Sequence, residues 1–182
     1  MLITEYKRES GQDFPVQIFA SDIDAETIAR ARQCRYPKSI ADSVSAERLK
    51  LFFKKEGEYY RVSKQIRSMV VFAVQNAIKD PPFSKLDLIT CRNLMIYLEP
   101  ELQKKLLLLF HYSLNPEGFL LLGSAESVGE LAHLYQPYNQ LQKIFRRIEG
   151  PAPCWPLFKV SSSAGPASGP GIPGPRGRKR SR

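Results

Sequence analysis

Short apolar runs alternate with amphipathic segments over the first 150 residues of the chain. Runs rich in Val, Ile, Leu and Phe predict strands at residues 16–20, 59–62, 69–75, 86–90, 119–123 and 143–147. Apolar residues at helical spacing predict helices at residues 2–9, 25–32, 45–54 and 101–112, and residues 135–142 are expected to be irregular. Strands that alternate with helices are typical of an α/β fold with a mostly parallel sheet.

One stretch combines a buried-type strand with polar residues at its end. Residues 86–90 are apolar, and Cys91, Arg92 and Asn93 follow directly. A second apolar run ends at Tyr97, and Pro100 then opens a helix. In open α/β sheets, ligands lie just beyond the carboxyl ends of the strands. The stretch therefore predicts one side of a ligand-binding crevice, although residue types alone fit an ordinary surface loop equally well.

Two other predicted strands also end in polar residues. Asp22 follows residues 16–20, and Asn76 follows residues 69–75. An acid at such a strand end can accept hydrogen bonds from ribose hydroxyls. Taken alone, Asp22 is more simply explained as a residue at a helix start, where Asp is common.

Length and composition exclude several classes of protein. A chain of 182 residues favours one domain, and no apolar run of 18 residues predicts a membrane span. The N-terminus lacks the apolar core of a signal peptide, so we expect a cytoplasmic protein. Three cysteines without metal-ligand spacing predict free thiols and no metal site.

The net charge of +9 is concentrated at the C-terminal end. Residues 151–182 hold six basic residues and no acids, which leaves +3 for residues 1–150. That nearly balanced charge gives no case for nucleic-acid binding by the folded body.

Residues 150–182 are rich in Ser, Gly, Pro and Ala, so we predict a folded part at residues 1–149 and a disordered basic tail at 150–182. The tail could contact nucleic acid or anionic lipid. A solvated linker is the favoured interpretation, because aromatic residues do not interleave with its basic residues.

The word CRNLMIY, residues 91–97, resembles the CRNVMIY signature of CheR-type chemotaxis methyltransferases, which methylate receptor glutamates with S-adenosylmethionine. VQIFASDID and LNPEGFLLLGSAES resemble the second-strand and fifth-strand motifs of the same family, in the same order. On these matches, residues 1–148 are identified as a member of that family. The resemblance implies a class I methyltransferase fold, a Rossmann-like and mostly parallel seven-stranded sheet whose last strand is antiparallel.

The resemblance also implies a role for individual residues. Asp22 would hold the ribose hydroxyls of S-adenosylmethionine, and Asn76 and Ala77 would lie against the adenine. The 91–93 segment would line the cofactor cleft, with Cys91 and Arg92 at its floor and Asn93 beside them. Tyr97 would direct its hydroxyl towards the methyl-transfer centre as the catalytic residue.

The implied reaction asks for little acid–base chemistry. A glutamate side chain, with a reference pKa of about 4.3, is already ionised at neutral pH. The sulfonium methyl is activated by the cofactor itself, so catalysis needs in-line positioning and exclusion of water. The chain accordingly shows no Ser/His/Asp or Cys/His system, and His111 and His133 are assigned no role.

The sequence also departs from the family. Relatives carry a first strand and a glycine-containing cofactor loop before the helix that ends near Arg8. We therefore expect a C-terminal piece of a methyltransferase domain that lacks the first strand, cut from a longer protein such as a CheB/CheR-type fusion. Residues 1–182 alone are expected to be inactive and prone to aggregation.

Two function classes fit these features: a protein-glutamate methyltransferase, and a truncated, inactive binding module of a signalling protein. A nicotinamide-binding Rossmann domain is excluded, because no G-x-G-x-x-G precedes Asp22. The expected partner is the cytoplasmic domain of a chemotaxis receptor, and the full-length form is expected to be a monomer. Residues 54–62 are expected to form a receptor-facing antiparallel hairpin whose short loop does not tether a receptor tail tightly.

Overall fold

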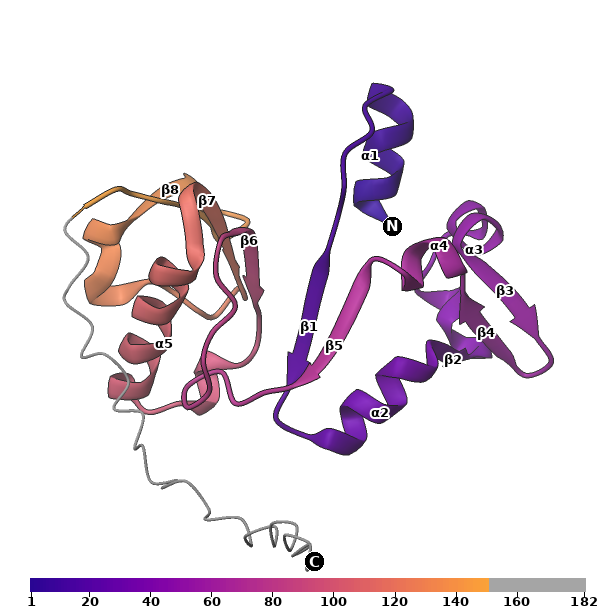
Figure 1. Ribbon diagram of the computed structural model, residues 1–182, viewed down its shortest axis with the longest axis horizontal. Helices are drawn as coiled ribbons and strands as arrows, with labels where there is room; N and C mark the ends of the chain where they lie inside the picture. The colour runs from indigo at the N-terminus through magenta and orange to yellow at the C-terminus, as the bar shows by residue number, and fades with distance from the viewer. Residues whose placement is uncertain (151–182) are drawn as a thin grey trace, which may run out of the picture. The chain divides into compact units, whose positions relative to one another are not determined.

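A computed structural model describes residues 1–150 of the chain (Figure 1). The predicted disordered tail lies outside the described residues, apart from Gly150. Within residues 1–150, no helix is both long and apolar enough to cross a membrane.

Helices and strands alternate along residues 1–150, as the sequence pattern predicts. The α-helices are α1 (Leu2–Ser10), α2 (Ala25–Gln33), α3 (Ala46–Phe52), α4 (Lys64–Arg67) and α5 (Pro100–Ser113). The strands are β1 (Ile18–Asp22), β2 (Arg35–Pro37), β3 (Phe53–Glu56), β4 (Tyr59–Val62), β5 (Val70–Val74), β6 (Leu86–Cys91), β7 (Leu114–Leu122), β8 (Tyr135–Asn139) and β9 (Ile144–Arg147). Three short 3₁₀ helices are η1 (Lys38–Asp42), η2 (Met95–Tyr97) and η3 (Gly129–Leu134).

The strands of residues 1–150 form three sheets. β1 pairs in parallel with β5, and β6 pairs in parallel with β7. In the larger sheet, of order β6-β7-β9-β8, β9 runs antiparallel to both β7 and β8. The predicted α/β class with parallel pairing and an antiparallel last strand is confirmed, but within residues 1–150 the parallel pairs lie in two separate sheets instead of one seven-stranded sheet.

The antiparallel sheet β2-β4-β3 confirms the predicted hairpin. β3 and β4 pair from Phe53 opposite Val62 to Glu56 opposite Tyr59. Gly57 makes the tight turn possible, because its φ of 59° is one that residues with a Cβ rarely adopt.

Three sequence predictions for strands were wrong in their bounds or type. Residues 135–139 form β8 rather than an irregular segment, because pairing with β9 and burial of Tyr135 outweigh the poor strand propensity of Pro137. β7 starts at Leu114, ahead of the expected Phe119. β1 ends at Asp22, so that residue is the last of the strand.

β6 is less buried than its apolar sequence suggests. Leu88 is 52% exposed, whereas Cys91 at the end of the strand is buried. Within the described residues β6 pairs with β7 alone, so its other edge and part of its apolar surface are open.

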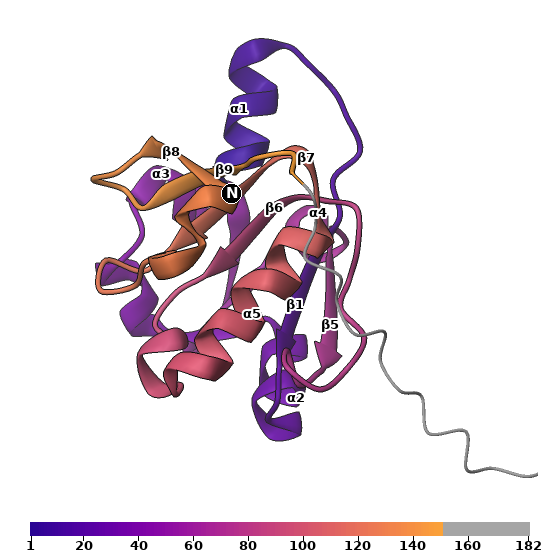
Figure 2. The same cartoon turned by 90° about the vertical axis from the view of Figure 1, so that its left-hand side faces the viewer.

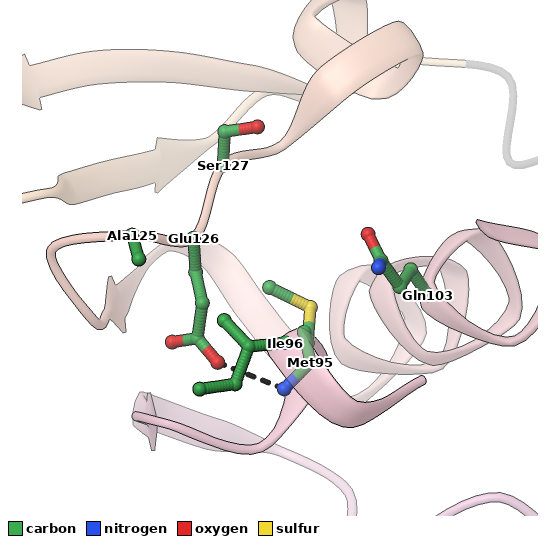
Figure 3. Close-up of a pocket in the computed structure, with 6 residues that line it drawn as sticks. All are labelled: Met95, Ile96, Gln103, Ala125, Glu126 and Ser127. Atoms are coloured by element: carbon green, nitrogen blue, oxygen red, sulfur yellow. Dashed lines mark hydrogen bonds between the residues drawn. The ribbon is translucent and has the colours of Figure 1, made fainter. Parts of the chain in front are cut away.

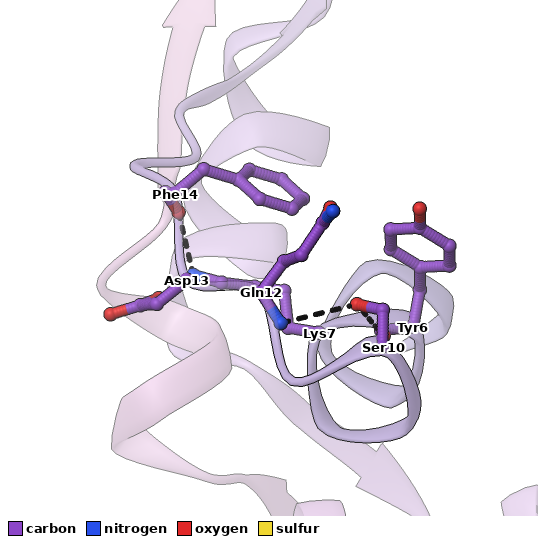
Figure 4. A network of polar contacts seen from close by, with 6 residues as sticks. All are labelled: Tyr6, Lys7, Ser10, Gln12, Asp13 and Phe14. Carbon is purple, nitrogen blue, oxygen red and sulfur yellow. Dashed lines mark hydrogen bonds and ion pairs between the residues drawn. The ribbon is translucent and has the colours of Figure 1, made fainter.

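The end of α1 is fixed by a small polar network (Figure 4). Gly11 adopts a left-handed conformation with φ of 69° and ends the helix, as expected. The Lys7 ammonium then donates to the Phe14 carbonyl at 2.6 Å and pairs with the Asp13 carboxylate at 2.6 Å. These contacts set the direction in which the chain leaves α1 towards β1.

The main core lies between α5 and the sheet that contains β7 (Figure 2). Leu106 and Leu107 of α5 pack with Leu120 and Leu122 of β7, and all four are buried. Burial of such side chains stabilises the fold by about 1.5–3 kcal/mol each. This packing fixes the orientation of the strand end at Leu122.

His111, for which no role was predicted, is buried in the same part of the molecule. Its ring meets the Tyr135 ring edge-to-face at 5.7 Å, and its Nε2 lies 3.0 Å from the Ile148 carbonyl oxygen. Burial lowers the pKa of His111, and the charges of Arg147 and His133 lower it further against the opposing effect of the Ile148 carbonyl. The folded protein therefore holds this ring neutral.

The neutral state of His111 makes stability depend on pH. As pH falls through the unfolded-state pKa of about 6.5, the unfolded chain gains a proton that the folded chain resists, so the free energy of unfolding decreases. We expect the urea midpoint to fall between pH 7 and pH 5, and His111→Gln to reduce that fall. The exposed His133→Gln is the comparison variant: it removes only one of the charges that lower the His111 pKa, so it should reduce the fall much less than His111→Gln. An equal fall in the His111→Gln variant would contradict the assignment.

Candidate functional site

Asp22 lies at the carboxyl end of β1, next to the carboxyl end of β5. In the parallel register Asp22 is opposite Val74, and the Gln75 amide donates to the Asp22 carbonyl oxygen at 2.9 Å. The exposed Asp22 carboxylate accepts a hydrogen bond from the Asp24 amide at 2.9 Å. Asp24, rather than Asp22, caps helix α2 by accepting from the Glu26 amide at 2.9 Å. The simpler explanation of Asp22 as the helix cap is therefore wrong.

Asn76 organises the turn that follows β5. The side-chain oxygen Oδ1 accepts from the backbone amides of Ile78 at 3.0 Å and Lys79 at 3.1 Å. The backbone amide of Asn76 donates to the Asp80 carboxylate at 2.7 Å. The turn holds Ala77 and Ile78 against the main core. The side-chain oxygen of Asn76 thus stabilises the turn that follows the end of β5.

The segment after β6 contains the 91–93 residues singled out in the sequence. Cys91 is buried in the main core, and burial together with the Glu126 charge raises the pKa of its thiol to about 12. A thiol in this state is protonated at neutral pH and is not a nucleophile. Arg92 and Asn93 are exposed, and Asn93 adopts a left-handed conformation with φ of 58°.

Glu126 connects the end of β7 to the segment after β6 (Figure 3). One carboxylate oxygen, Oε2, accepts from the Gly123 amide at 2.6 Å. The other, Oε1, accepts from the Leu94 amide at 2.9 Å and the Met95 amide at 2.8 Å. Only 4% of Glu126 is exposed, so these bonds replace its hydration.

The carboxylate of Glu126 remains charged in this buried place. Burial by itself raises the pKa of Glu126, but hydrogen bonds from the backbone of Gly123, Met95, Leu94 and Asn93 together outweigh it, and the net effect is a lowered pKa. A charged acceptor makes stronger bonds to amides than a neutral one. The two strand ends are therefore joined by charge-assisted hydrogen bonds.

Gly123 allows these two segments to approach closely. A Cβ at this position would lie 2.6 Å from the Glu126 Oε2 and 3.1 Å from both the backbone nitrogen and Oδ1 of Asn93. Real Cβ atoms essentially never come within 3.0 Å of another heavy atom, so a side chain here would force the Glu126 carboxylate away from its present position.

Tyr97 ends η2, two residues after the Glu126 contact. Its side chain is 80% exposed, whereas Met95 in the same turn is 2% exposed. The Tyr97 amide donates to the Leu94 carbonyl at 3.2 Å, which closes the turn. The fold thus presents the phenol to solvent from a turn that is anchored on its other side.

A small pocket of about 80 Å³ lies beside this turn (Figure 3). It is lined by Met95, Ile96, Gln103, Ala125, Glu126 and Ser127. The Gln103 side chain donates to the Leu98 carbonyl at 2.9 Å and so holds the far end of η2 to α5.

The structure brings the predicted site residues together in two groups. Asp22 and Asn76 lie at the adjacent ends of β1 and β5, while Cys91 ends β6 and Arg92, Asn93 and Tyr97 follow it. Ala77, which follows the end of β5, packs against the core cluster to which Cys91 belongs. Asp22 and Cys91 belong to different sheets.

Comparison with known proteins identifies the family. The family model described as the SAM-binding domain of CheR methyltransferases matches residues 1–144. The chain belongs to the CheR methyltransferase family. The resemblance carried by CRNLMIY is therefore confirmed, and S-adenosylmethionine is the cofactor that the family description names.

Curated relatives agree with this family. A putative methyltransferase, Cher3, of Pseudomonas putida is 35% identical over 150 residues, which cover 77% of this chain and 55% of that protein. The chemotaxis protein methyltransferase Cher2 of the same organism is 33% identical over 141 residues, covering 75% and 51%. An uncharacterised 104.1 kDa protein of Rhodobacter capsulatus is 32% identical over 154 residues, covering 84% of this chain and 16% of that protein. The chain thus spans about half the length of two of these relatives and a sixth of the third.

Sequence reasoning missed Glu126 as a residue of the candidate site. The signal was present in LNPEGFLLLGSAES, where an acid follows a strand-ending glycine by three residues. Its partners, Leu94 and Met95, are more than thirty positions away, and only the parallel pairing of β6 with β7 brings them near.

The close approach at Gly123 yields a stability prediction. In Gly123→Ala the new methyl group must displace the Glu126 carboxylate or the Asn93 backbone, so we expect a loss of about 1–3 kcal/mol in the free energy of unfolding. Urea denaturation would measure it. Gly150→Ala is the matched control, since a Cβ at Gly150 meets nothing within 4 Å, and it should be neutral. Equal stability of both variants would show that the segments separate without cost.

Proposed function

We propose that this chain is part of an enzyme that transfers the methyl group of S-adenosylmethionine to glutamate side chains of chemotaxis receptors. The observation that carries the proposal is the set of polar strand ends: Asp22 and Asn76 beside each other, and the anchored 91–97 segment after β6. Family membership and relatives named chemotaxis protein methyltransferases support the same reaction.

Asp22 suits the binding of a ribose. Its carboxylate is exposed at the end of a parallel strand, the position at which Rossmann-like folds bind ribose hydroxyls. We infer that Asn76 and Ala77 flank the adenine and that Cys91, Arg92 and Asn93 line the cleft. The 76–80 turn and the Glu126 contacts fix these backbone positions before any ligand arrives.

The proposed reaction needs placement more than proton transfer. The cofactor supplies a methyl group already activated for transfer, and the attacking glutamate carboxylate is ionised at neutral pH. The protein then has to align the carboxylate with the methyl group and exclude water. We infer that the Tyr97 hydroxyl contacts the reacting groups; this is supported by the exposure of Tyr97 on a turn that Glu126 anchors.

Replacement of Asp22 tests the cofactor site. In the full-length protein, Asp22→Ala should weaken binding of S-adenosylhomocysteine by about 1–3 kcal/mol, because one or two hydrogen bonds to a charged acceptor are lost. Isothermal titration calorimetry measures the affinity. Asp22→Asn keeps an acceptor for the Asp24 amide and removes only the charge, so it should also bind more weakly. The exposed Asp42→Ala is the control, and equal affinity in all variants would remove Asp22 from the site.

Replacement of Tyr97 tests the catalytic assignment. Tyr97→Phe keeps the ring and removes the hydroxyl, so we expect turnover to fall by about tenfold or more while cofactor affinity changes little. The assay is transfer of radiolabelled methyl groups from S-adenosylmethionine to a receptor cytoplasmic domain. The exposed Tyr112→Phe on α5 is the control. A loss confined to cofactor affinity would contradict the proposed place of Tyr97.

A further inference from the structure

The backbone between β6 and η2 carries little intrinsic order. Asn93 adopts a left-handed conformation, Leu94 at the start of η2 provides no side-chain cap, and η2 is only three residues long. Short 3₁₀ turns have poor internal hydrogen-bond geometry. The position of this segment must therefore come from contacts with other parts of the molecule.

Glu126 supplies such a contact with both carboxylate oxygens. Oε2 accepts from the Gly123 amide, and the Glu126 amide in turn donates to the Gly123 carbonyl oxygen at 3.0 Å. This reciprocal pair fixes the carboxylate to the end of β7. Oε1 is then free to accept from two successive amides, those of Leu94 and Met95.

The two amides that Oε1 binds stand directly before the exposed residues of the turn. Met95 is buried, but Ile96 is 49% exposed and Tyr97 is 80% exposed. The first amides of any helix lack a partner within it, so without Oε1 the buried Met95 amide and the partly buried Leu94 amide would lose the acceptor they have here. The contact therefore determines where the exposed half of the turn lies.

We propose that Glu126 is a positioning residue, whose carboxylate holds the 93–97 turn against the end of β7 and thereby fixes the place of Tyr97. This inference deepens the proposed function. Only the expected effect on turnover rests on the proposed function, whereas the contact between Glu126 and the turn does not. Glu126 acts through the backbone of Leu94 and Met95.

The first test measures the turn itself, in the full-length protein, by amide hydrogen exchange and mass spectrometry. Glu126→Gln should raise exchange in peptides covering residues 93–97 by about tenfold, because a neutral amide offers only one acceptor oxygen and adds an unwanted donor. Peptides of α5 and β9 should keep their protection. Glu130→Gln is the matched control, four residues on and 84% exposed in its side chain, and should change nothing in residues 93–97.

The second test separates positioning from folding. In the methyl-transfer assay, Glu126→Gln should lower turnover by about tenfold with S-adenosylhomocysteine affinity changed less than threefold, and Glu130→Gln should match the wild type. Glu126→Asp keeps the charge but shortens the reach by one methylene group, so it should give an intermediate result in both tests.

The outcomes are distinct. If Glu126→Gln leaves hydrogen exchange in residues 93–97 unchanged, Glu126 has no role in holding the turn and the proposal is overturned. If exchange rises equally in α5 and β9, Glu126 has a general structural role and the proposal is also overturned. If Glu126→Gln does not fold, the same comparison of hydrogen exchange in residues 93–97 with exchange in α5 and β9 is made for Glu126→Asp. If the wild-type protein transfers no methyl group, the proposed function fails while the exchange result still decides whether Glu126 holds the turn.

Discussion

The parallel pairing of β6 with β7 is the constraint on which the candidate site depends. It sets Cys91 opposite Leu122, so the chain leaves both strands at the same edge of the sheet. Gly123 then brings the two exits within contact distance, and the Glu126 carboxylate joins them. The strands themselves are held by packing of β7 on α5, where Leu106 and Leu120 are fully buried. A conventional hydrophobic core thus determines the geometry of a polar, exposed turn.

Local sequence was sufficient for most of the elements. Apolar runs located the parallel strands β1, β5, β6 and β7 and the antiparallel strand β9, because strands that pack in an α/β fold are rich in apolar residues. β8 was missed because it contains Pro137 and polar residues, and its existence follows from pairing with β9 and from the buried Tyr135. The Tyr135 hydroxyl donates to the Leu107 carbonyl oxygen of α5 at 2.6 Å. Such a contact joins residues 28 positions apart and leaves no local signal in the sequence.

The residues proposed for the candidate site come from the sequence, whereas the contacts that hold them are seen only in the structure. Polar residues after apolar strands indicated Asp22, Asn76 and the 91–93 segment, and the CRNLMIY resemblance added Tyr97. The sequence did not indicate that Asn76 shapes its own turn or that Cys91 is a buried, protonated thiol. The spacing of Glu126 from Gly123 was only a weak local signal, because the burial of a carboxylate and the position of its hydrogen-bond donors are properties of the folded chain.

The contrast between Met95 and Tyr97 shows how one short turn serves two purposes. A 3₁₀ helix turns by a third of a circle per residue, so neighbouring side chains point in different directions. Met95 points into the core and contributes burial, while Tyr97 points to solvent and contributes little to packing. Since Glu126 holds the Leu94 and Met95 amides, which precede Tyr97 in the turn, contacts of the buried Glu126 carboxylate determine where the exposed ring lies. An exposed residue can then be precisely placed without being packed, which is what a reaction that depends on alignment of a carboxylate with a methyl group requires.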